Sequence, residues 1–392
     1  MKKISILFLT NAYPDFESSY RGIFVQKMAL LLQRDEYEIS VVTPKIYKES
    51  LSVEGHHGIK VYRFPFFSGE KLLIEHEKIP YLRMICYFIS GVLFTVYALL
   101  KHRCRFIHVH WAIPTGLIGT LVGFLLKRPL IVTIHGSDLR MAMTTSSWMR
   151  RLFLFVCQQA IHLTCVSQVQ KEEMVKLGID EWKISVFPMG IDETILENGK
   201  QREKEKGGRP LTILSNRNLQ PIYNLPLLIR AIPLILKEEP HTNVLIAGEG
   251  PDRKRLEKEA NDLRVTSSIQ FLGRVPHEKM VDLLAHVDVY VSTSLFDGTS
   301  VSLLEAMGAG AFPVVTDIPA NREWIVHGEN GFLVPPHEEK LLANRVIDAL
   351  RSRSLIEKSR AKNLTLVGEK AVWPVSIKKV KEVYEEYVTL KQ

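Results

Sequence analysis

Short apolar runs alternate along the chain with longer segments in which apolar residues recur at helical spacing. This alternation is typical of α/β proteins, in which parallel strands are joined by helices. The first half contains seven predicted strands: Ile4–Leu9, Ile39–Thr43, Lys60–Phe64, Phe106–His110, Leu130–Ile134, His162–Val166 and Ile184–Phe187. Between them, helical periodicity is clearest in Gly22–Gln33 and Met149–Gln159.

The second half repeats the pattern with six predicted strands: Leu211–Ser215, Asn243–Ala247, Ile269–Leu272, Val287–Ser292, Ala311–Val315 and Gly331–Val334. Its predicted helices are Pro226–Lys237, Asp252–Leu263, His277–Ala285, Val301–Ala309, Asn321–Val326 and Glu338–Arg351. The pattern therefore predicts two doubly wound sheets of similar size.

The break between the halves falls near Pro188–Asp192, and the charged stretch Glu197–Pro210 that follows reads as a solvated loop. We therefore expect one domain over residues 1–190 and a second over residues 191–370. Residues 371–392, with a helix over Pro374–Leu390, form a separate C-terminal segment.

Length and charge narrow the range of functions. A chain of 392 residues is long enough for two domains, and its net charge of +8 favours anionic partners such as nucleotide phosphates or an acidic membrane surface. No nucleic-acid-binding module is recognisable, so no nucleic-acid partner is expected. The four cysteines show no metal-binding spacing, and free thiols in a reducing cytoplasm are expected.

The most informative segment runs from Leu295 to Val315. A strand leads into a polar turn, a helix and a second apolar strand, and the carboxylates Asp297 and Glu305 bracket the turn and the helix start. The backbone N–H groups from Gly298 to Val301, including those of Thr299 and Ser300, can bind a negatively charged group. The two carboxylates can accept hydrogen bonds from hydroxyls. A sugar nucleotide has this layout of sugar, diphosphate and ribose.

This segment resembles the signature of retaining glycosyltransferases of family 4, which have the GT-B fold of two Rossmann-like domains facing a central cleft. The family usually has a second Glu where Asp297 stands, and the separation from Glu305 is kept. The resemblance implies that Asp297 contacts the sugar hydroxyls and that Glu305 holds the ribose. The C-terminal helix is expected to cross back onto the first domain.

In the first half, the loop with Arg21 and Gly22 resembles the family segment in which a glycine opens a helix near the donor diphosphate. His110 and the His135-Gly136-Ser137-Asp138 motif follow predicted strands, where ligands of open α/β sheets bind. By the resemblance, His135 faces the transferred sugar, and His110 and Asp138 are further substrate-binding candidates.

In the second half, Arg217 matches the diphosphate-binding arginine of the family. The usual nearby lysine is absent, and Tyr223 and Asn224 occupy its place, so we expect Arg21 or these two polar groups to assist. The remaining donor-site candidates by resemblance are the turn glycines Gly248 and Gly250, and Arg274 beside the base.

The resemblance implies retaining transfer of a sugar from a UDP- or GDP-sugar to the hydroxyl of a saccharide or lipid-linked saccharide, with no cofactor and no metal. His135, Asp297 and Arg217 are the expected catalytic residues, and surface polysaccharide synthesis is the expected setting. Two alternatives remain: a decayed member that binds sugar nucleotide without transfer, and a sugar-nucleotide epimerase.

One apolar segment, Ile85–Leu100, is almost free of polar groups and is bounded by Arg83 and Lys101. It is about one turn short of the roughly 20 residues that a membrane span needs. It is therefore either a buried helix or a helix in the membrane interface. Basic residues beside apolar segments suit a cytoplasmic enzyme that docks on the inner face of the membrane.

Overall fold

The computed structural model describes residues 3–16, 19, 21–73, 81–202 and 210–389, and these divide into two compact units. The first unit contains Met1–Phe187 and Ile377–Gln392, and the second contains Pro188–Ser376. The sequence placed these divisions after residues 190 and 370. Tyr20, Leu390 and residues 203–209 of the predicted charged loop lie outside the described residues.

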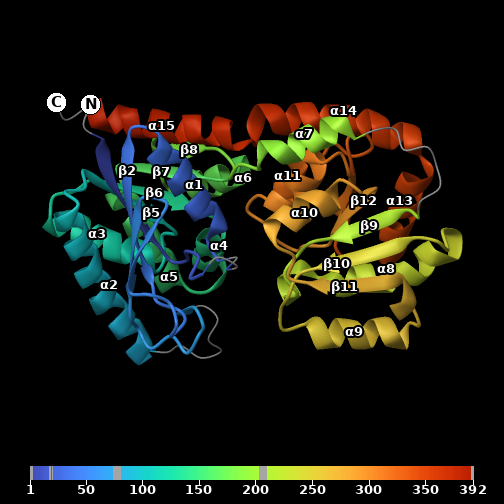
Figure 1. The fold of residues 1–392 in the computed structure, drawn as a ribbon, viewed down its shortest axis with the longest axis horizontal. Helices are drawn as coiled ribbons and strands as arrows, with labels where there is room; N and C mark the ends of the chain where they lie inside the picture. The colour runs from blue at the N-terminus through green and yellow to red at the C-terminus, as the bar shows by residue number, and fades with distance from the viewer. Residues whose placement is uncertain (1–2, 17–18, 20, 74–80, 203–209, 390–392) are drawn as a thin grey trace. The chain divides into compact units, whose positions relative to one another are not determined.

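The described part of the first unit holds an eight-stranded sheet with the order β3-β4-β2-β1-β5-β6-β7-β8 (Figure 1). All neighbours are parallel except β3 and β4. The strands are β1 (Ile4–Thr10), β2 (Tyr37–Pro44), β3 (Val53–His56), β4 (Ile59–Phe64), β5 (Phe106–His110), β6 (Leu130–Ile134), β7 (His162–Cys165) and β8 (Ile184–Val186).

The helices of this unit are α1 (Ile23–Arg34), α2 (Tyr81–Lys101), α3 (Thr115–Leu125), α4 (Ser137–Thr144), α5 (Ser147–Gln159) and α6 (Gln168–Lys176), with a 3-10 turn at η2 (Glu181–Lys183). A core of buried aliphatic and aromatic side chains joins the sheet to α2, α3 and α5, including Leu9, Tyr87, Ile118 and Phe153. Strands buried in this way are mostly apolar, which is why their runs were recognisable in the sequence.

The described part of the second unit holds a six-stranded, wholly parallel sheet with the order β11-β10-β9-β12-β13-β14 (Figure 1). Its strands are β9 (Thr212–Ser215), β10 (Asn243–Ala247), β11 (Ile269–Gly273), β12 (Val289–Ser292), β13 (Phe312–Thr316) and β14 (Phe332–Val334). Two clusters of buried side chains, one with Ile213 and Ile232 and one with Leu214 and Met307, form its core.

The helices of this unit are α7 (Glu193–Gln201), α8 (Leu225–Glu238), α9 (Arg253–Asp262), α10 (His277–Leu284), α11 (Val301–Gly308), α12 (Pro319–Arg322), α13 (Glu339–Arg351) and α14 (Arg353–Lys370), with 3-10 turns at η3 (Pro221–Tyr223) and η4 (Thr266–Ser268). The loop prediction for Glu197–Pro210 was wrong at its start, because α7 extends to Gln201. Ile195 and Leu196 of α7 are buried in the core and stabilise the helix.

The last helix, α15 (Trp373–Thr389), begins in the second unit and ends in the first. Within the first unit, Tyr384 of α15 is fully buried and its hydroxyl lies 2.5 Å from Nδ1 of His108. The Lys381 ammonium lies 2.6 Å from a carboxylate oxygen of Asp35. These contacts hold the end of the chain on the first unit.

Candidate active site

Strand order places the candidate residues of each unit where ligands of doubly wound sheets bind. In the second unit the order reverses between β9 and β12, and in the first unit between β1 and β5. Arg217 follows β9, and Asp297 follows β12. At such a reversal the loops beyond the carboxyl ends diverge and leave room for a ligand.

Arg217 is the centre of the polar cluster in the second unit. Its guanidinium donates to a carboxylate oxygen of Asp297 at 2.5 Å and to the hydroxyl of Ser300 at 2.7 Å. The ring of Tyr223 lies 4.3 Å from the guanidinium carbon. The structure thus brings three predicted residues into contact with Arg217, which is itself only 8% exposed. An arginine fixed in this way is oriented before any ligand arrives.

Several buried polar atoms in and beside this cluster lack a protein partner within the described part of the chain. They include Nε of Arg217 and the side-chain oxygen of Asn216. A buried polar atom without a partner is costly, and such atoms are commonly satisfied by water or by a ligand. The cluster can therefore still bind an anion through Arg217.

The start of α11 adds backbone donors. The Ser300 hydroxyl accepts from the N–H of Leu303 at 3.2 Å, so the side chain caps the helix. The N–H groups of Val301 and Ser302 belong to the first turn and have no partner within the helix. Gly298 and Thr299 form the turn just before it. The start of α11 thus presents backbone donors that can bind negative charge, and the predicted anion contact there stays a prediction.

Glu305 lies on α11 and is only 8% exposed. Its carboxylate lies 3.7 Å from Nδ1 of His277, whose Nε2 lies 2.8 Å from Asp192. Burial raises the pKa of Glu305 to about 7; the neighbouring His277 acts to lower it and Asp192 to raise it. His277 and Asp192 were not predicted from the sequence, because nothing in their local pattern shows that they meet Glu305.

The remaining candidates of the second unit are two turn glycines, Asn224 and Arg274. A Cβ at Gly248 would lie 2.2 Å from the backbone oxygen of Arg217, and one at Gly250 would lie 2.2 Å from that of Leu219. Only glycine fits at either position. Asn224 donates its side-chain N–H to Pro336 at 3.0 Å and so fixes a neighbouring loop. Arg274 follows β11 and is exposed.

The candidate histidines of the first unit meet at the ends of β5 and β6. Nδ1 of His110 lies 3.1 Å from Nε2 of His135, and the ring of His135 is also close to those of Trp111 and Phe24. Burial, with a smaller effect from His108, lowers the pKa of His135 to about 3. Both rings of the pair are therefore neutral, and one donates to the other. His110 is fully buried and fixes the orientation of His135.

Asp138 is buried, and both of its carboxylate oxygens accept hydrogen bonds from backbone N–H groups. It accepts from the N–H groups of Ala112, Gly136 and Leu139 at 2.9, 3.1 and 3.1 Å. Burial nevertheless raises its pKa to about 6, against the effect of these donors. Asp138 thus ties the loop after β5 to the loop after β6. The expected direct ligand contact of Asp138 stays a prediction.

Gly22 opens α1 beside the turn after β1. Its φ is +67°, and a Cβ there would lie 2.1 Å from the backbone oxygen of Ala12. The backbone of the helix start therefore approaches that turn as closely as only glycine allows. The guanidinium of the neighbouring Arg21 lies 5.4 Å from the ring centre of Tyr47.

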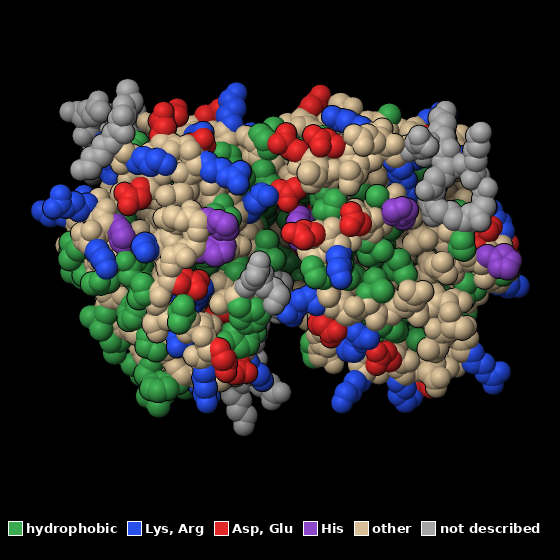
Figure 2. Space-filling model, in the orientation of Figure 1, with side chains coloured by type: hydrophobic (Ala, Val, Ile, Leu, Met, Phe, Trp, Pro, Cys, Tyr) green, Lys and Arg blue, Asp and Glu red, His purple; other side chains and the backbone are tan. Residues whose placement is uncertain are grey.

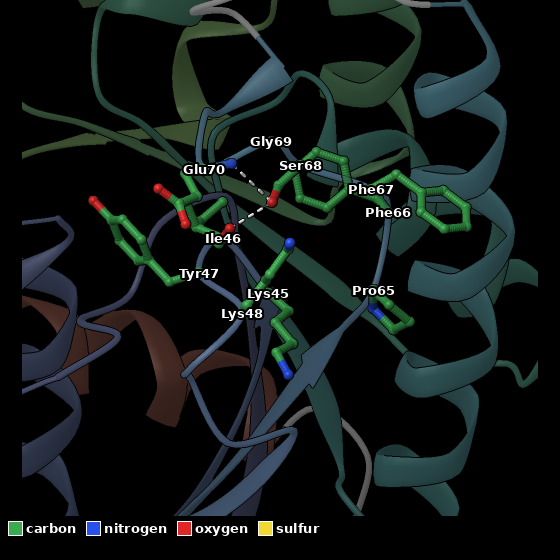
Figure 3. A pocket seen from close by; sticks show the side chains of 10 residues that line it. All are labelled: Lys45, Ile46, Tyr47, Lys48, Pro65, Phe66, Phe67, Ser68, Gly69 and Glu70. Atoms are coloured by element: carbon green, nitrogen blue, oxygen red, sulfur yellow. Dashed lines mark hydrogen bonds between the residues drawn. The ribbon is translucent and has the colours of Figure 1, made fainter.

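A hollow of about 260 Å³ lies at the carboxyl ends of β2 and β4 in the first unit (Figure 3). Lys45–Lys48 line one side and Pro65–Glu70 the other. The hydroxyl of Ser68 donates to the backbone oxygen of Ile46 and accepts from the N–H of Glu70, which fixes the second segment. Two of the lining residues, Lys45 and Lys48, are basic. They were not predicted as site residues, since they belong to no sequence motif.

The geometry of the second unit suits a ligand with a negatively charged centre and hydroxyl groups. Arg217 and the start of α11 supply positive charge, and the Asp297 and Glu305 carboxylates supply hydrogen-bond acceptors. Among the described residues, no group of three or more His, Cys, Asp or Glu side chains is placed to hold a metal ion.

Known proteins share the fold of the whole chain. Sucrose-phosphate synthase from Thermosynechococcus elongatus superimposes with a TM-score of 0.82 at 15% identity, covering 99% of this chain and 100% of that one. Anabaena HepE in complex with UDP has a TM-score of 0.76 at 18% identity, covering 98% and 100%. These likenesses establish the GT-B fold.

Sequence comparison assigns the family. An uncharacterized glycosyltransferase of Methanocaldococcus jannaschii is 25% identical over 99% of this chain and 100% of its own, and a putative teichuronic acid biosynthesis glycosyltransferase of Bacillus subtilis is 25% identical over 80% and 81%. The family profile for Glycosyltransferase Family 4 matches residues 22–194, and that for Glycosyl transferases group 1 matches residues 197–364. The chain therefore belongs to the family 4 glycosyltransferases and is a transferase with the GT-B fold.

Proposed function

We propose that this enzyme moves a sugar from a UDP-sugar to an acceptor hydroxyl and retains the configuration at the anomeric carbon. The observation that carries the proposal is the buried Arg217, held by Asp297 and Ser300 beside the start of α11. UDP is preferred to GDP because HepE, which shares the fold, binds UDP. Glu305 is the proposed partner of the ribose hydroxyls.

The chemistry follows from the charge that develops as the donor breaks. When the bond between the anomeric carbon and the phosphate oxygen lengthens, negative charge grows on the diphosphate, and Arg217 and the N–H groups of Val301 and Ser302 stabilise it. The acceptor oxygen attacks from the same face. Its proton passes to the leaving phosphate oxygen. The neutral ring of His135 can hold a hydroxyl of the transferred sugar without adding charge.

We propose that the acceptor is a saccharide or a lipid-linked saccharide of a surface polysaccharide or glycolipid. The proteins similar to this chain include the putative teichuronic acid enzyme and a phosphatidyl-myo-inositol mannosyltransferase of Mycobacterium leprae. Lys45 and Lys48 favour an acceptor with negative charge, such as a phosphate-linked one. The proposed location is the cytoplasmic face of the membrane.

Incubation of the enzyme with UDP-sugars and candidate acceptors, followed by NMR of the product's anomeric centre, tests the proposal. A product with the donor's configuration supports retaining transfer, and an inverted product contradicts it. Tight donor binding with neither transfer nor hydrolysis would point to a decayed, non-catalytic member. Formation of a donor epimer without any acceptor would point to an epimerase.

A further inference from the structure

Helix α2 exposes the face that a surface helix usually keeps polar. The side chains that pack inward recur at helical spacing and are Tyr87, Gly91, Thr95, Ala98 and Leu99. The opposite face is formed by large apolar side chains that reach solvent: Tyr81, Leu82, Ile85, Ile89, Leu93, Tyr97 and Leu100. Three of these, Leu82, Leu93 and Tyr81, are exposed by 73, 63 and 70%. Contiguous exposed apolar surface of this kind marks an interaction site.

The inward face of α2 fixes the helix to the domain. Tyr87 packs edge-on against Phe64 of β4, and its hydroxyl donates to the side-chain oxygen of Asn11 at 3.0 Å. A Cβ at Gly91 would lie 2.5 Å from Ile118 of α3, so α2 and α3 are in close contact. The helix has 21 residues and the composition of a membrane span, but only 28% of its 18-residue apolar stretch is buried. Because one face is packed on the sheet, α2 is placed to lie flat in a membrane interface.

The apolar surface continues onto α3 and α5. Phe124 of α3 and Trp148 of α5 are exposed by 79 and 59%. Together with Phe88 of α2, Leu121 and Phe155, they line an open groove of about 570 Å³. Figure 2 shows hydrophobic side chains gathered over the α2 and α3 side of the first unit. We call this continuous surface of α2, α3 and α5 the apolar face.

Basic residues border the apolar face at the ends of its helices. Lys127 and Arg128 follow α3 and line a second hollow that shares Thr120, Phe124 and Gln159 with the groove. Arg150 and Arg151 lie in α5, and Lys101 ends α2. The side chains of all these basic residues, including Lys127 and Arg128, are exposed. Apolar side chains rimmed by cations match the chemistry of an anionic lipid bilayer.

We propose that the apolar face docks on the surface of an anionic phospholipid bilayer, with α2 lying in the plane of the interface. The inference deepens the proposed function, in which the acceptor is lipid-linked, but it stands on residues separate from the donor site. A second copy of this chain is a poorer occupant, because pairing two such faces would bring two sets of basic residues together.

Flotation of the full chain with vesicles tests the proposal. Vesicles of phosphatidylcholine with phosphatidylglycerol are compared with vesicles of phosphatidylcholine alone, and we expect strong binding to the first and weak binding to the second. The double variant Lys127→Gln with Arg128→Gln is expected to lower the affinity for anionic vesicles by about 30-fold, since each basic residue near the surface contributes about fivefold. Lys254→Gln with Arg255→Gln, an exposed basic pair on α9, is the matched control and should bind as wild type.

A second pair of variants tests the apolar contribution. Ile89→Asp with Leu93→Asp is expected to abolish vesicle binding, whereas Leu51→Asp, at a residue 61% exposed elsewhere in the same unit, should not change it. Circular dichroism melting checks that each variant is folded. The charge variant keeps the test decisive if the apolar variant does not fold, because Lys127 and Arg128 are exposed side chains.

Three outcomes would overturn the inference. They are no binding to anionic vesicles, binding that the variants at the apolar face do not weaken, and a concentration-dependent dimer that Ile89→Asp with Leu93→Asp dissociates. Calorimetric binding of UDP, measured on the same samples, separates the two claims. A wild-type protein that binds UDP but not anionic vesicles contradicts only the docking surface, and one that binds anionic vesicles but not UDP contradicts only the donor site.

Discussion

Replacing Glu305 by Gln should make the free energy of unfolding less sensitive to rising pH. The carboxyl is buried in the second unit, and burial raises its pKa from 4.5 to about 7, with His277 lowering it and Asp192 raising it. A carboxyl that holds its proton more tightly when folded stabilises the fold fully below the unfolded pKa. That stability is lost as the pH rises from about 4.5 to about 7. Gln has nearly the same shape and does not titrate, so the variant should lack this loss.

The magnitude follows from the shift. One pKa unit corresponds to about 1.4 kcal/mol, so a shift from 4.5 to about 7 corresponds to about 3 kcal/mol over the whole range. Between about pH 5 and about pH 8, we expect the free energy of unfolding of Glu305→Gln to rise by about 2–3 kcal/mol relative to wild type. Any constant effect of the amide cancels, because the comparison is between two pH values.

Hydrogen-exchange mass spectrometry of peptides from β12 and β13, followed across a urea series, measures this free energy for the second unit alone. Equal pH dependence in the two proteins would contradict a raised pKa of Glu305, since it would mean that this group titrates as an ordinary carboxyl. The same variant should bind UDP at least about tenfold more weakly, because a carboxylate accepts from hydroxyls more strongly than an amide oxygen. The ribose site would thus be maintained at a cost in stability.

Four further variants test other parts of the structure. Arg217→Lys keeps the charge but loses the fork that joins Asp297 and Ser300, and calorimetry should show UDP binding weakened by about tenfold; unchanged affinity would contradict the cluster. Gly22→Ala should lower the melting temperature, with a loss of at least about 2 kcal/mol, because the added Cβ meets a backbone oxygen at 2.1 Å. In Asp138→Asn an NH₂ group replaces one of the two oxygens that accept from three backbone N–H groups, so the free energy of unfolding in urea should fall by about 1–3 kcal/mol. An unchanged free energy of unfolding would contradict its positioning role. His135→Ala should reduce the turnover number at least about 100-fold while UDP affinity stays within about twofold, and equal loss of both would argue against a role confined to transfer.

Much of the fold was predictable because the buried parallel strands are mostly apolar. The predicted bounds of β5, β6 and β10 agree with the structure residue for residue. The edge strand β3 was missed, because its exposed sequence Val53–His56 contains a glycine and two polar residues and pairs only with β4. Helices α3, α4, α6 and α14 were also not predicted.

The segment from β12 to α11 was readable because its signals are local. Ser300 caps the helix, and the polar turn separates two apolar strands. The interactions that set the chemistry of Glu305 are not local: His277 and Asp192 come from distant parts of the chain. Only the fold shows that they meet and that the carboxyl is buried. Because burial is what raises the pKa of Glu305, the raised pKa could not be inferred from the motif.

Helix α2 shows a different limit. The apolar content of Ile85–Leu100 left two alternatives, a buried helix or one in the membrane interface, because hydrophobicity alone does not say which face packs inward. The structure extends the helix to Tyr81–Lys101 and leaves Ile85, Ile89 and Leu93 exposed. The fully buried alternative is therefore wrong.

Calorimetric titration of the purified protein with UDP, and then with GDP, tests the central claim most directly. We expect selective binding of UDP to wild type, and at least about 30-fold weaker binding to Arg217→Ala, which removes the guanidinium that orients the cluster. Binding of neither nucleotide, or equal binding of UDP to wild type and to Arg217→Ala, would contradict a donor site built on Arg217.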